Sequence, residues 1–286
     1  MEKSTHSTSV PTINIQDFRK NQYAGREELL FNELCGARHI KIPHKHDFFM
    51  IALFYKASGV HNIDSVDYTI GDKEVHVLFP EQMHKWTINE ETVGYQLMIE
   101  RSFFEQFAPF FRFSFTNYQK HPVIKLTQKS FDMLIYEFNE IREELETQDS
   151  LVQLIHARAG VIAAIVSKEA ELNFTEFKVY QSNPRLAKFN MLIDEFYKDQ
   201  KTTSFYASKL NISSNYLNIL CKKHLGISAT QLIHQRVSTE AKRLLQARQL
   251  SIKEISFELG FIDHSYFSNF FKAKTGMTPT EFREYI

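Results

Sequence analysis

The spacing of apolar residues changes along the chain and separates a strand-like region from two helical ones. Between residues 39 and 100, short apolar runs alternate with turns. Residues 48–57 form a continuous apolar and aromatic run, and residues 60–64 alternate apolar with polar side chains. Further short runs follow at residues 68–70, 75–79, 86–88 and 95–99. Short strands at such close spacing predict a β-sandwich or barrel.

Apolar residues recur at intervals of three and four between residues 127 and 172, which predicts two helices separated near Asp149 and Ser150. The second helix is apolar nearly all round at residues 161–166, so it needs more than one surface to pack against. Two interpretations stay open. The helix packs against its own barrel, or the helix pair dimerises with its copy in another subunit.

The C-terminal region has the pattern of successive helices with recognisable ends. Capping residues stand at the expected starts and glycines at the expected ends: Asn183, Ser213, Ser228, Ser251 and Asp263, then Gly226, Gly260 and Gly276. A short helix, a turn and a second helix occur twice, at residues 203–224 and 251–275. This repeat predicts two helix-turn-helix units.

The composition indicates a globular protein. With 286 residues, of which 43% are hydrophobic and 24% charged, the chain is long enough for two domains and too apolar to be disordered. It contains no uncharged apolar run long enough for a membrane span and no apolar signal core near its start, so we expect a cytoplasmic protein. Cys35 and Cys221 are too few for a disulfide framework or a thiolate zinc site.

The net charge of zero conceals an asymmetry between the two regions. Residues 1–182 contain 19 Lys and Arg against 25 Asp and Glu, whereas residues 183–286 contain 15 against 9. The net charge is therefore +6 in the C-terminal region and −6 in the N-terminal region. A basic, helical module is typical of a nucleic-acid binder.

The second helix of each repeated unit has a polar face opposite its apolar one. The two polar faces consist of Ser214, Asn215, Asn218 and Lys222, and of His264, Ser265, Ser268, Asn269 and Lys272. Amide and hydroxyl side chains can pair with base edges in the major groove, and a lysine can neutralise phosphate. A merely solvated face is the alternative, but the same polar register in two copies favours DNA recognition. The intervening helix, at 1.5 Å per residue, should be about 28 Å long, and adjacent major-groove faces lie about 34 Å apart.

Several short segments of the C-terminal region resemble the signature of the AraC/XylS family of bacterial transcription regulators. They are residues 241–245 (AKRLL), 251–255 (SIKEI), 259–261 (LGF), 265–268 (SYFS), 270–272 (FFK) and 275–279 (TGMTP). The resemblance implies two helix-turn-helix units that bind promoter DNA, and RNA polymerase as a further partner. It implies base-reading positions for Asn215, Asn218, Ile219, His264, Ser265, Ser268 and Asn269. Together with the two polar faces, the full set of expected DNA contacts also includes Ser213, Ser214, Lys222 and Lys272. Many members carry arginine where Asn269 stands, so we expect the preferred base there to shift from guanine toward adenine.

The N-terminal region resembles the cupin-like barrel that often precedes this domain, through residues 43–47 (PHKHD) and 79–84 (FPEQMH). Metal-binding cupins use H-x-H, a glutamate four or five residues later and a third histidine. Here Met50 and Ile51 occupy the glutamate positions. We therefore expect no metal and no cofactor, although a three-nitrogen site stays an alternative. The expected effector pocket is lined by His44, His46, Phe48, His84 and Trp86.

The sequence thus predicts an α+β protein with two domains. Residues 1–175 should form a cupin-like β-barrel with a dimerisation helix pair, and residues 183–286 an all-α double helix-turn-helix domain. The expected function is that of a transcriptional regulator, not an enzyme, which couples binding of a small-molecule effector to promoter binding as a homodimer. Two rivals stay open: a metal-dependent cupin oxygenase fused to a DNA-binding domain, which would need the missing fourth ligand, and a regulator whose barrel responds to a partner protein. Activation and repression are equally compatible with the sequence.

Overall fold

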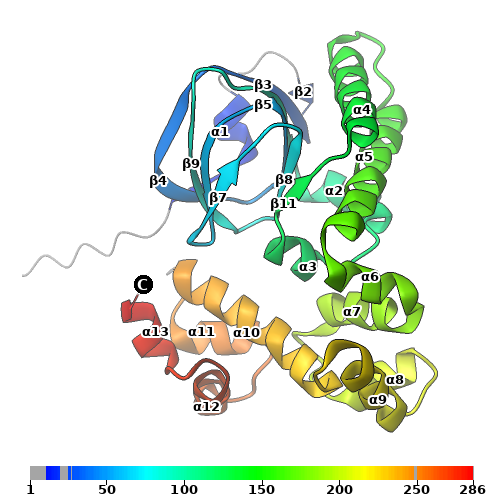
Figure 1. Ribbon diagram of the computed structural model, residues 1–286. Helices are drawn as coiled ribbons and strands as arrows, with labels where there is room; N and C mark the ends of the chain where they lie inside the picture. The colour runs from blue at the N-terminus through cyan, green and yellow to red at the C-terminus, as the bar shows by residue number, and fades with distance from the viewer. Residues whose placement is uncertain (1–10, 20–24, 27, 248–249, 286) are drawn as a thin grey trace, which may run out of the picture. The chain divides into compact units, whose positions relative to one another are not determined.

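The computed structural model describes residues 11–19, 25–26, 28–247 and 250–285. The chain divides into one compact unit from Thr12 to Ser182 and a second from Asn183 onwards. Among the described residues, both β-sheets lie in the first unit and the second unit is helical (Figure 1). The predicted α+β class is therefore confirmed.

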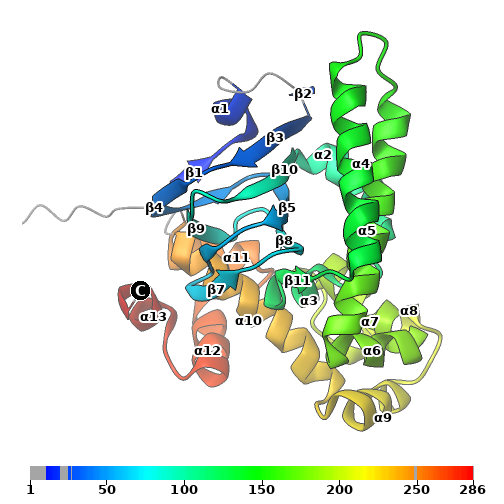
Figure 2. The same cartoon turned by 45° about the horizontal axis from the view of Figure 1, so that its top comes forward.

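The described residues of the first unit form two sheets that face each other (Figure 2). In spatial order, one sheet consists of β1 (Thr12–Ile13), β4 (Arg38–His46), β9 (Met83–Ile88), β6 (Gly59–Ile63) and β7 (Val66–Ile70). The other consists of β11 (Val123–Lys125), β8 (Glu74–Leu78), β5 (Phe49–Lys56), β10 (Val93–Ile99), β3 (Leu29–Cys35) and β2 (Gly25–Arg26). Neighbouring strands are antiparallel except for β1, which runs parallel to β4.

Strand β5 explains the continuous apolar run in the sequence. Its residues from Phe49 to Phe54 are all buried, because the strand is covered on both faces. On one face Met50 belongs to the core between the sheets, and on the other Phe49 packs against Phe104 and Phe111. A strand covered on both faces loses the alternation of apolar and polar positions.

Helical segments accompany these sheets: α1 (Ile15–Arg19), α2 (Arg101–Phe107), the 3-10 helix η1 (Ala108–Phe110), α3 (Phe115–Lys120), α4 (Gln128–Glu146), α5 (Val152–Asn173) and α6 (Thr175–Ser182). The two predicted helices correspond to α4 and α5, which lie side by side (Figures 1 and 2). No helix in the described residues is long and apolar enough to cross a membrane.

Helix α5 packs on more than one side against its own chain. It contacts α4, and it also contacts α2, η1, α6 and β11. Its residue Ile165 is only 7% exposed, whereas Leu154 is 40% exposed. The interpretation that the helix packs on its own barrel unit therefore holds for Ile165, while Leu154 and Val161 leave an apolar strip uncovered.

The second unit consists of α7 (Pro184–Phe196), α8 (Thr203–Lys209), α9 (Ser214–Leu225), α10 (Ala229–Ala247), α11 (Ile252–Glu258), α12 (His264–Thr275) and α13 (Pro279–Tyr285). The predicted caps are confirmed, since Asn183, Ser213, Ser251 and Asp263 each accept a backbone N–H of the following turn. Helix α10 contacts helices of both repeated units, α9 on one side and α11 and α12 on the other. The predicted end of α10 near Arg248 lies outside the described residues.

Gly260, in the turn between α11 and α12, is required by both conformation and space. Its φ is +69°, a left-handed value that favours glycine. A Cβ atom there would lie 1.9 Å from the backbone oxygen of Lys198. The corresponding turn between α8 and α9 has Asn211 at φ 53°, a residue that tolerates this conformation.

A partly buried ion network joins α7 to α10. Arg236 on α10 lies 2.8 Å from Asp194 and 2.9 Å from Glu240, and Arg243 lies 2.5 Å from Glu240. Burial alone would raise the pKa of Glu240, but Arg243 and Arg236 lower it to about 2. The network therefore holds Glu240 ionised.

Candidate functional site

Helices α9 and α12 each follow a short helix and a turn, as the two predicted helix-turn-helix units require. On α9, Asn215, Ile219 and Lys222 are exposed. On α12, exposed side chains in the same register are Ser265, Asn269 and Lys272, and His264 is exposed at the first turn. Each helix thus presents to solvent a face with hydrogen-bonding groups near its start and a cation near its end. That arrangement suits a helix whose N-terminal turns meet base edges while its far end meets phosphate.

Asn218 has a different environment from the other predicted contact residues. It is half-buried, and its Oδ1 accepts the backbone N–H of Ala229 at 3.0 Å. This bond joins α9 to the start of α10. In this structure Asn218 therefore links two helices, whereas Asn215 and Asn269 are exposed. The expected base contact of Asn218 stays a prediction.

The serines among the predicted contacts also take part in local hydrogen bonds. Ser213 Oγ accepts the backbone N–H of Tyr216 at 3.1 Å, and Ser268 Oγ donates to the backbone oxygen of His264 at 2.9 Å. Ser214 is half-buried at the first turn of α9. Of the amides, Asn215 and Asn269 are the exposed ones.

Sequence reasoning missed the aromatic and apolar side chains beside these polar faces. Tyr216 on α9 is 40% exposed and Tyr266, at the corresponding position of α12, is 67% exposed. Ile262, in the turn before α12, is 97% exposed. Exposed tyrosines at equivalent positions of a repeat were a signal that the sequence already contained.

A second candidate site is a cavity of about 330 Å³ in the first unit. It is lined by Phe18, Asn32, Arg38, Ile40, His44, His46, His84, Trp86 and Gln96. Four of the five predicted effector residues are among these. Phe48 is not, because its ring stacks on that of His46 with centroids 4.3 Å apart. Sequence reasoning also missed Asn32 and Gln96, which come from strands of the facing sheet and stand in no recognisable motif.

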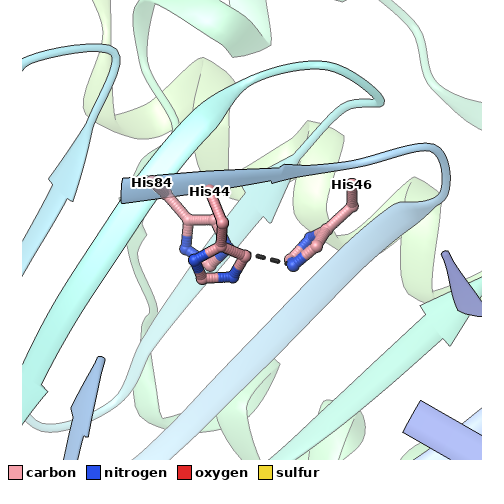
Figure 3. Close-up of side chains that lie close together, drawn as sticks. All are labelled: His44, His46 and His84. Carbon is pink, nitrogen blue, oxygen red and sulfur yellow. Dashed lines mark hydrogen bonds between the residues drawn. The ribbon is translucent and has the colours of Figure 1, made fainter. Parts of the chain in front are cut away.

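The three predicted histidines line this cavity, and Figure 3 shows that their side chains lie close together. His44 and His46 project from β4, and His84 pairs with His44 across the neighbouring strand β9. A register shift between Ile40 and His44 interrupts the pairing just before the histidines. One ring nitrogen from each residue lies within 4.8 Å of the others, and Nε2 of His46 is 3.3 Å from Nε2 of His84.

Two further histidines, His61 on β6 and His76 on β8, lie next to this group and were not predicted. His61 Nε2 is 2.8 Å from His84 Nδ1, and His61 Nδ1 is 2.8 Å from His76 Nδ1. Both are completely buried. The chain of rings therefore crosses from one sheet to the other.

Burial keeps all five imidazoles neutral at neutral pH. It lowers the pKa of His46 to about 3, with a further contribution from His44, and it lowers the pKa values of His61 and His84 well below the usual 6.5. The pKa values of His44 and His76 are lowered by the same cause. Neutral imidazoles offer lone pairs, and lone pairs can bind a metal ion or accept a hydrogen bond.

Trp86 has an unused donor in the same region. Its side chain is 3% exposed, and its Nε1 has no hydrogen-bond partner among the described residues. A buried N–H without a partner is costly, so a bound molecule with an acceptor atom would stabilise it.

Comparison with known proteins gives matches to transcription regulators. Residues 206–285 match a helix-turn-helix domain family. The chain is 24% identical over 252 residues to the uncharacterized HTH-type transcriptional regulator YfiF of Bacillus subtilis, covering 84% of this chain and 78% of that one. It is 23% identical over 247 residues to the HTH-type transcriptional activator RhaR of Salmonella dublin, covering 84% and 86%.

Two solved structures are also similar. The C-terminal domain of the two-component response regulator yesN from Fusobacterium nucleatum is 38% identical, covers 33% of this chain and 93% of its own, and has a TM-score of 0.32. Unsaturated fatty acid-bound ToxT from Vibrio cholerae is 16% identical, covers 92% and 97%, and has a TM-score of 0.40.

Proposed function

Because the chain belongs to the AraC/XylS family of transcriptional regulators, we propose that it binds promoter DNA through the exposed faces of α9 and α12. The observation that carries this proposal is the repeated register: Asn215, Ile219 and Lys222 on one helix correspond to Ser265, Asn269 and Lys272 on the other, and all are exposed. The +6 charge of residues 183–286 supports the same proposal.

Two substitutions on α12 should distinguish side chains that contact bases from side chains that contact phosphate. Asn269→Ala should cost about 1 to 3 kcal/mol on the preferred site and leave binding to random duplex nearly unchanged. Lys272→Ala should weaken binding to both DNAs alike, because it meets phosphate. Fluorescence anisotropy with the mapped site and a random duplex measures both. Equal losses on the two DNAs for Asn269→Ala would show that this side chain meets only the backbone.

Salt dependence tests the basic character of the interface. If about six phosphates are neutralised, the slope of log K against log salt should be near −5. The fragment of residues 183–286 should fold alone and keep this slope. A fragment whose binding is as strong at high as at low salt would contradict the proposal.

We place the sensor in the cavity of the first unit. Its volume of about 330 Å³ suits a small organic molecule. Ile40 and Trp86 offer an apolar wall, while Arg38, His46 and the free Nε1 of Trp86 favour an effector with an anionic or acceptor group. A compound that fits should raise the melting temperature of the full-length protein as its concentration rises. The shift should disappear in Arg38→Ala, and stabilisers unaffected by that change would bind elsewhere.

We assign the dimer contact to the uncovered strip of α4 and α5. Met133, Tyr136, Leu154 and Val161 are each at least 40% exposed, which is unusual for side chains of this kind on neighbouring helices. Leu154→Glu should give folded monomers, whereas Gln153→Glu, a change at the exposed neighbouring position, should not. Sedimentation that finds the unsubstituted protein monomeric with and without DNA would remove this assignment.

The remaining partners follow from the same proposal. A regulator bound at a promoter acts on RNA polymerase, and it works in the cytoplasm, where the DNA lies. Its function is binding rather than catalysis.

A further inference from the structure

The two helix-turn-helix units touch each other directly, at a place away from α9 and α12. One side of this contact is the loop between α7 and α8, residues 197–202, and the other is the turn between α11 and α12, residues 259–263. At its edge, Lys198 of the loop forms an ion pair with Glu258, the last residue of α11. We call this region the inter-unit contact.

Lys201 bonds to both sides of the inter-unit contact. Its Nζ donates to the backbone oxygen of Lys198 at 2.6 Å and to that of Gly260 at 3.4 Å. The same ammonium group lies 4.8 Å from the ring centroid of Phe261, within the range of a cation–π interaction. Lys201 is half-buried, and burial lowers its pKa. The side chain is therefore held among partners from both units instead of extending into solvent.

Both acceptor oxygens lie just beyond the end of a helix. Lys198 follows the end of α7, and Gly260 follows the end of α11. Carbonyl groups at helix ends have no partner within the helix and need a donor from elsewhere when they are packed. One ammonium group thus supplies donors to the ends of two helices that belong to different units.

The inter-unit contact brings backbone close to backbone. A Cβ atom on Gly260 would lie 1.9 Å from the backbone oxygen of Lys198 and 3.2 Å from Nζ of Lys201. The two segments can approach this closely because residue 260 has no side chain. One unit therefore cannot turn against the other without breaking the bonds of Lys201.

Short connections join the inter-unit contact to both α9 and α12. On one side, the hydroxyl of Tyr206 in α8 donates to the backbone oxygen of Gln200 at 2.7 Å, and α8 packs against α9. On the other side, the ring centroid of Phe261 lies 5.3 Å from that of Phe267 in α12. A shift at the inter-unit contact is therefore passed on to both α9 and α12.

We propose that Lys201 is a positioning residue, which fixes α9 relative to α12 and makes the protein selective for the distance between the two DNA segments that these helices bind. This inference rests on the proposed DNA binding. One base pair added between the segments moves them apart by about 3.4 Å and rotates one against the other by about 35°. Two units held by the inter-unit contact cannot both follow this change, whereas units held only through α10 follow it more easily.

The test is a series of duplexes in which one base pair is added or removed between the two segments of the mapped site. Fluorescence anisotropy measures the affinity of the full-length protein for each. The unsubstituted protein should bind the altered spacings at least about tenfold more weakly, because one unit loses its base contacts. Lys201→Met keeps an unbranched side chain but removes the ammonium group. It should reduce this spacing penalty about 2- to 10-fold, the range that corresponds to one hydrogen bond.

Lys188→Met is the matched control, because it removes the same charge from an exposed position on α7. It should weaken binding at every spacing alike and leave the spacing penalty unchanged. A side chain that only stabilises the fold would also leave the penalty unchanged, since the protein that stays folded would bind as before. The spacing penalty therefore distinguishes positioning from loss of charge and from loss of stability.

Urea unfolding followed by far-UV circular dichroism checks that each variant is folded. If Lys201→Met does not fold, Glu258→Ala takes its place, because it loosens the inter-unit contact at an ion pair that is exposed. It should reduce the spacing penalty in the same direction, by about twofold.

Two results would overturn the proposal: a folded Lys201→Met or Glu258→Ala protein with the spacing penalty of the unsubstituted protein, or an equal reduction of the penalty in Lys188→Met. Failure of the proposed function gives a different result, because the unsubstituted protein would then prefer no site at any spacing. Specific binding without a spacing penalty contradicts the positioning role alone and leaves DNA binding in place.

Discussion

Glu240→Gln should remove much of the acid sensitivity of the helical unit, because Glu240 is the shared acceptor of Arg236 and Arg243. Burial would raise its pKa, but the two arginines lower it from the usual 4.5 to about 2. One unit of pKa corresponds to about 1.36 kcal/mol, so the ionised group contributes about 3 kcal/mol. Breaking a buried ion pair usually costs a similar amount.

The sign of the pH dependence follows from the direction of the shift. A carboxyl whose pKa is lower in the folded state stabilises the fold above its unfolded pKa, and the contribution is lost as the pH falls toward the folded value. The unsubstituted unit should therefore lose about 3 kcal/mol of its free energy of unfolding between about pH 4.5 and pH 2 through this group. The variant should start lower by that amount at neutral pH and lack this loss.

Urea unfolding followed by far-UV circular dichroism at several pH values measures the difference. Trp86 fluorescence follows the first unit separately, because it is the one tryptophan and lies on β9. Glu195→Gln, at an exposed neighbour of Asp194 on α7, is the matched control and should change the free energy of unfolding by less than about 0.5 kcal/mol. A Glu240→Gln variant that unfolds in parallel with the unsubstituted protein at every pH would refute the reasoning.

Three further substitutions have distinct expected outcomes. Asn218→Ala should lower the free energy of unfolding by about 1 kcal/mol, because it removes the hydrogen bond to Ala229; urea unfolding measures this. The same variant should weaken binding to specific and random DNA alike, which fluorescence anisotropy measures. Ile165→Glu should unfold the first unit rather than release folded monomers, since this side chain is buried; dichroism beside sedimentation distinguishes the two. Gly260→Ala should cost clearly more in urea unfolding than Gly226→Ala, because both have positive φ but only Gly260 meets a backbone oxygen.

Local signals in the sequence predicted most of the helical unit. Caps such as Ser251 and helix-ending glycines such as Gly276 act within a few residues, so their geometry is encoded next to where it appears. The strand runs between residues 39 and 100 were visible for the same reason. Helices α2 and α3 were not predicted. They are only seven and six residues long, so a periodic pattern such as Phe103, Phe104 and Phe107 is too short to stand out.

The sequence predicted some residues of the candidate site and missed others. The H-x-H pattern identified His44 and His46, and a separate motif identified His84, because these residues stand in recognisable segments. No motif surrounds His61 or His76, since their roles arise from strands that meet only in the folded sheets. The hydrogen bond of Asn218 was not predicted, because its partner is the backbone of the next helix and helical periodicity alone does not show what a half-buried amide contacts.

The central claim is that one chain reads two adjacent major grooves with α9 and α12, and a protection footprint of the full-length protein on its promoter site tests it most directly. For each bound chain, two protected major-groove segments should lie one helical turn apart, about 34 Å. A Ser265→Ala, Asn269→Ala double variant should lose base protection in one segment and keep it in the other. A single protected segment per chain, or loss of both segments together in a folded variant, would contradict the account.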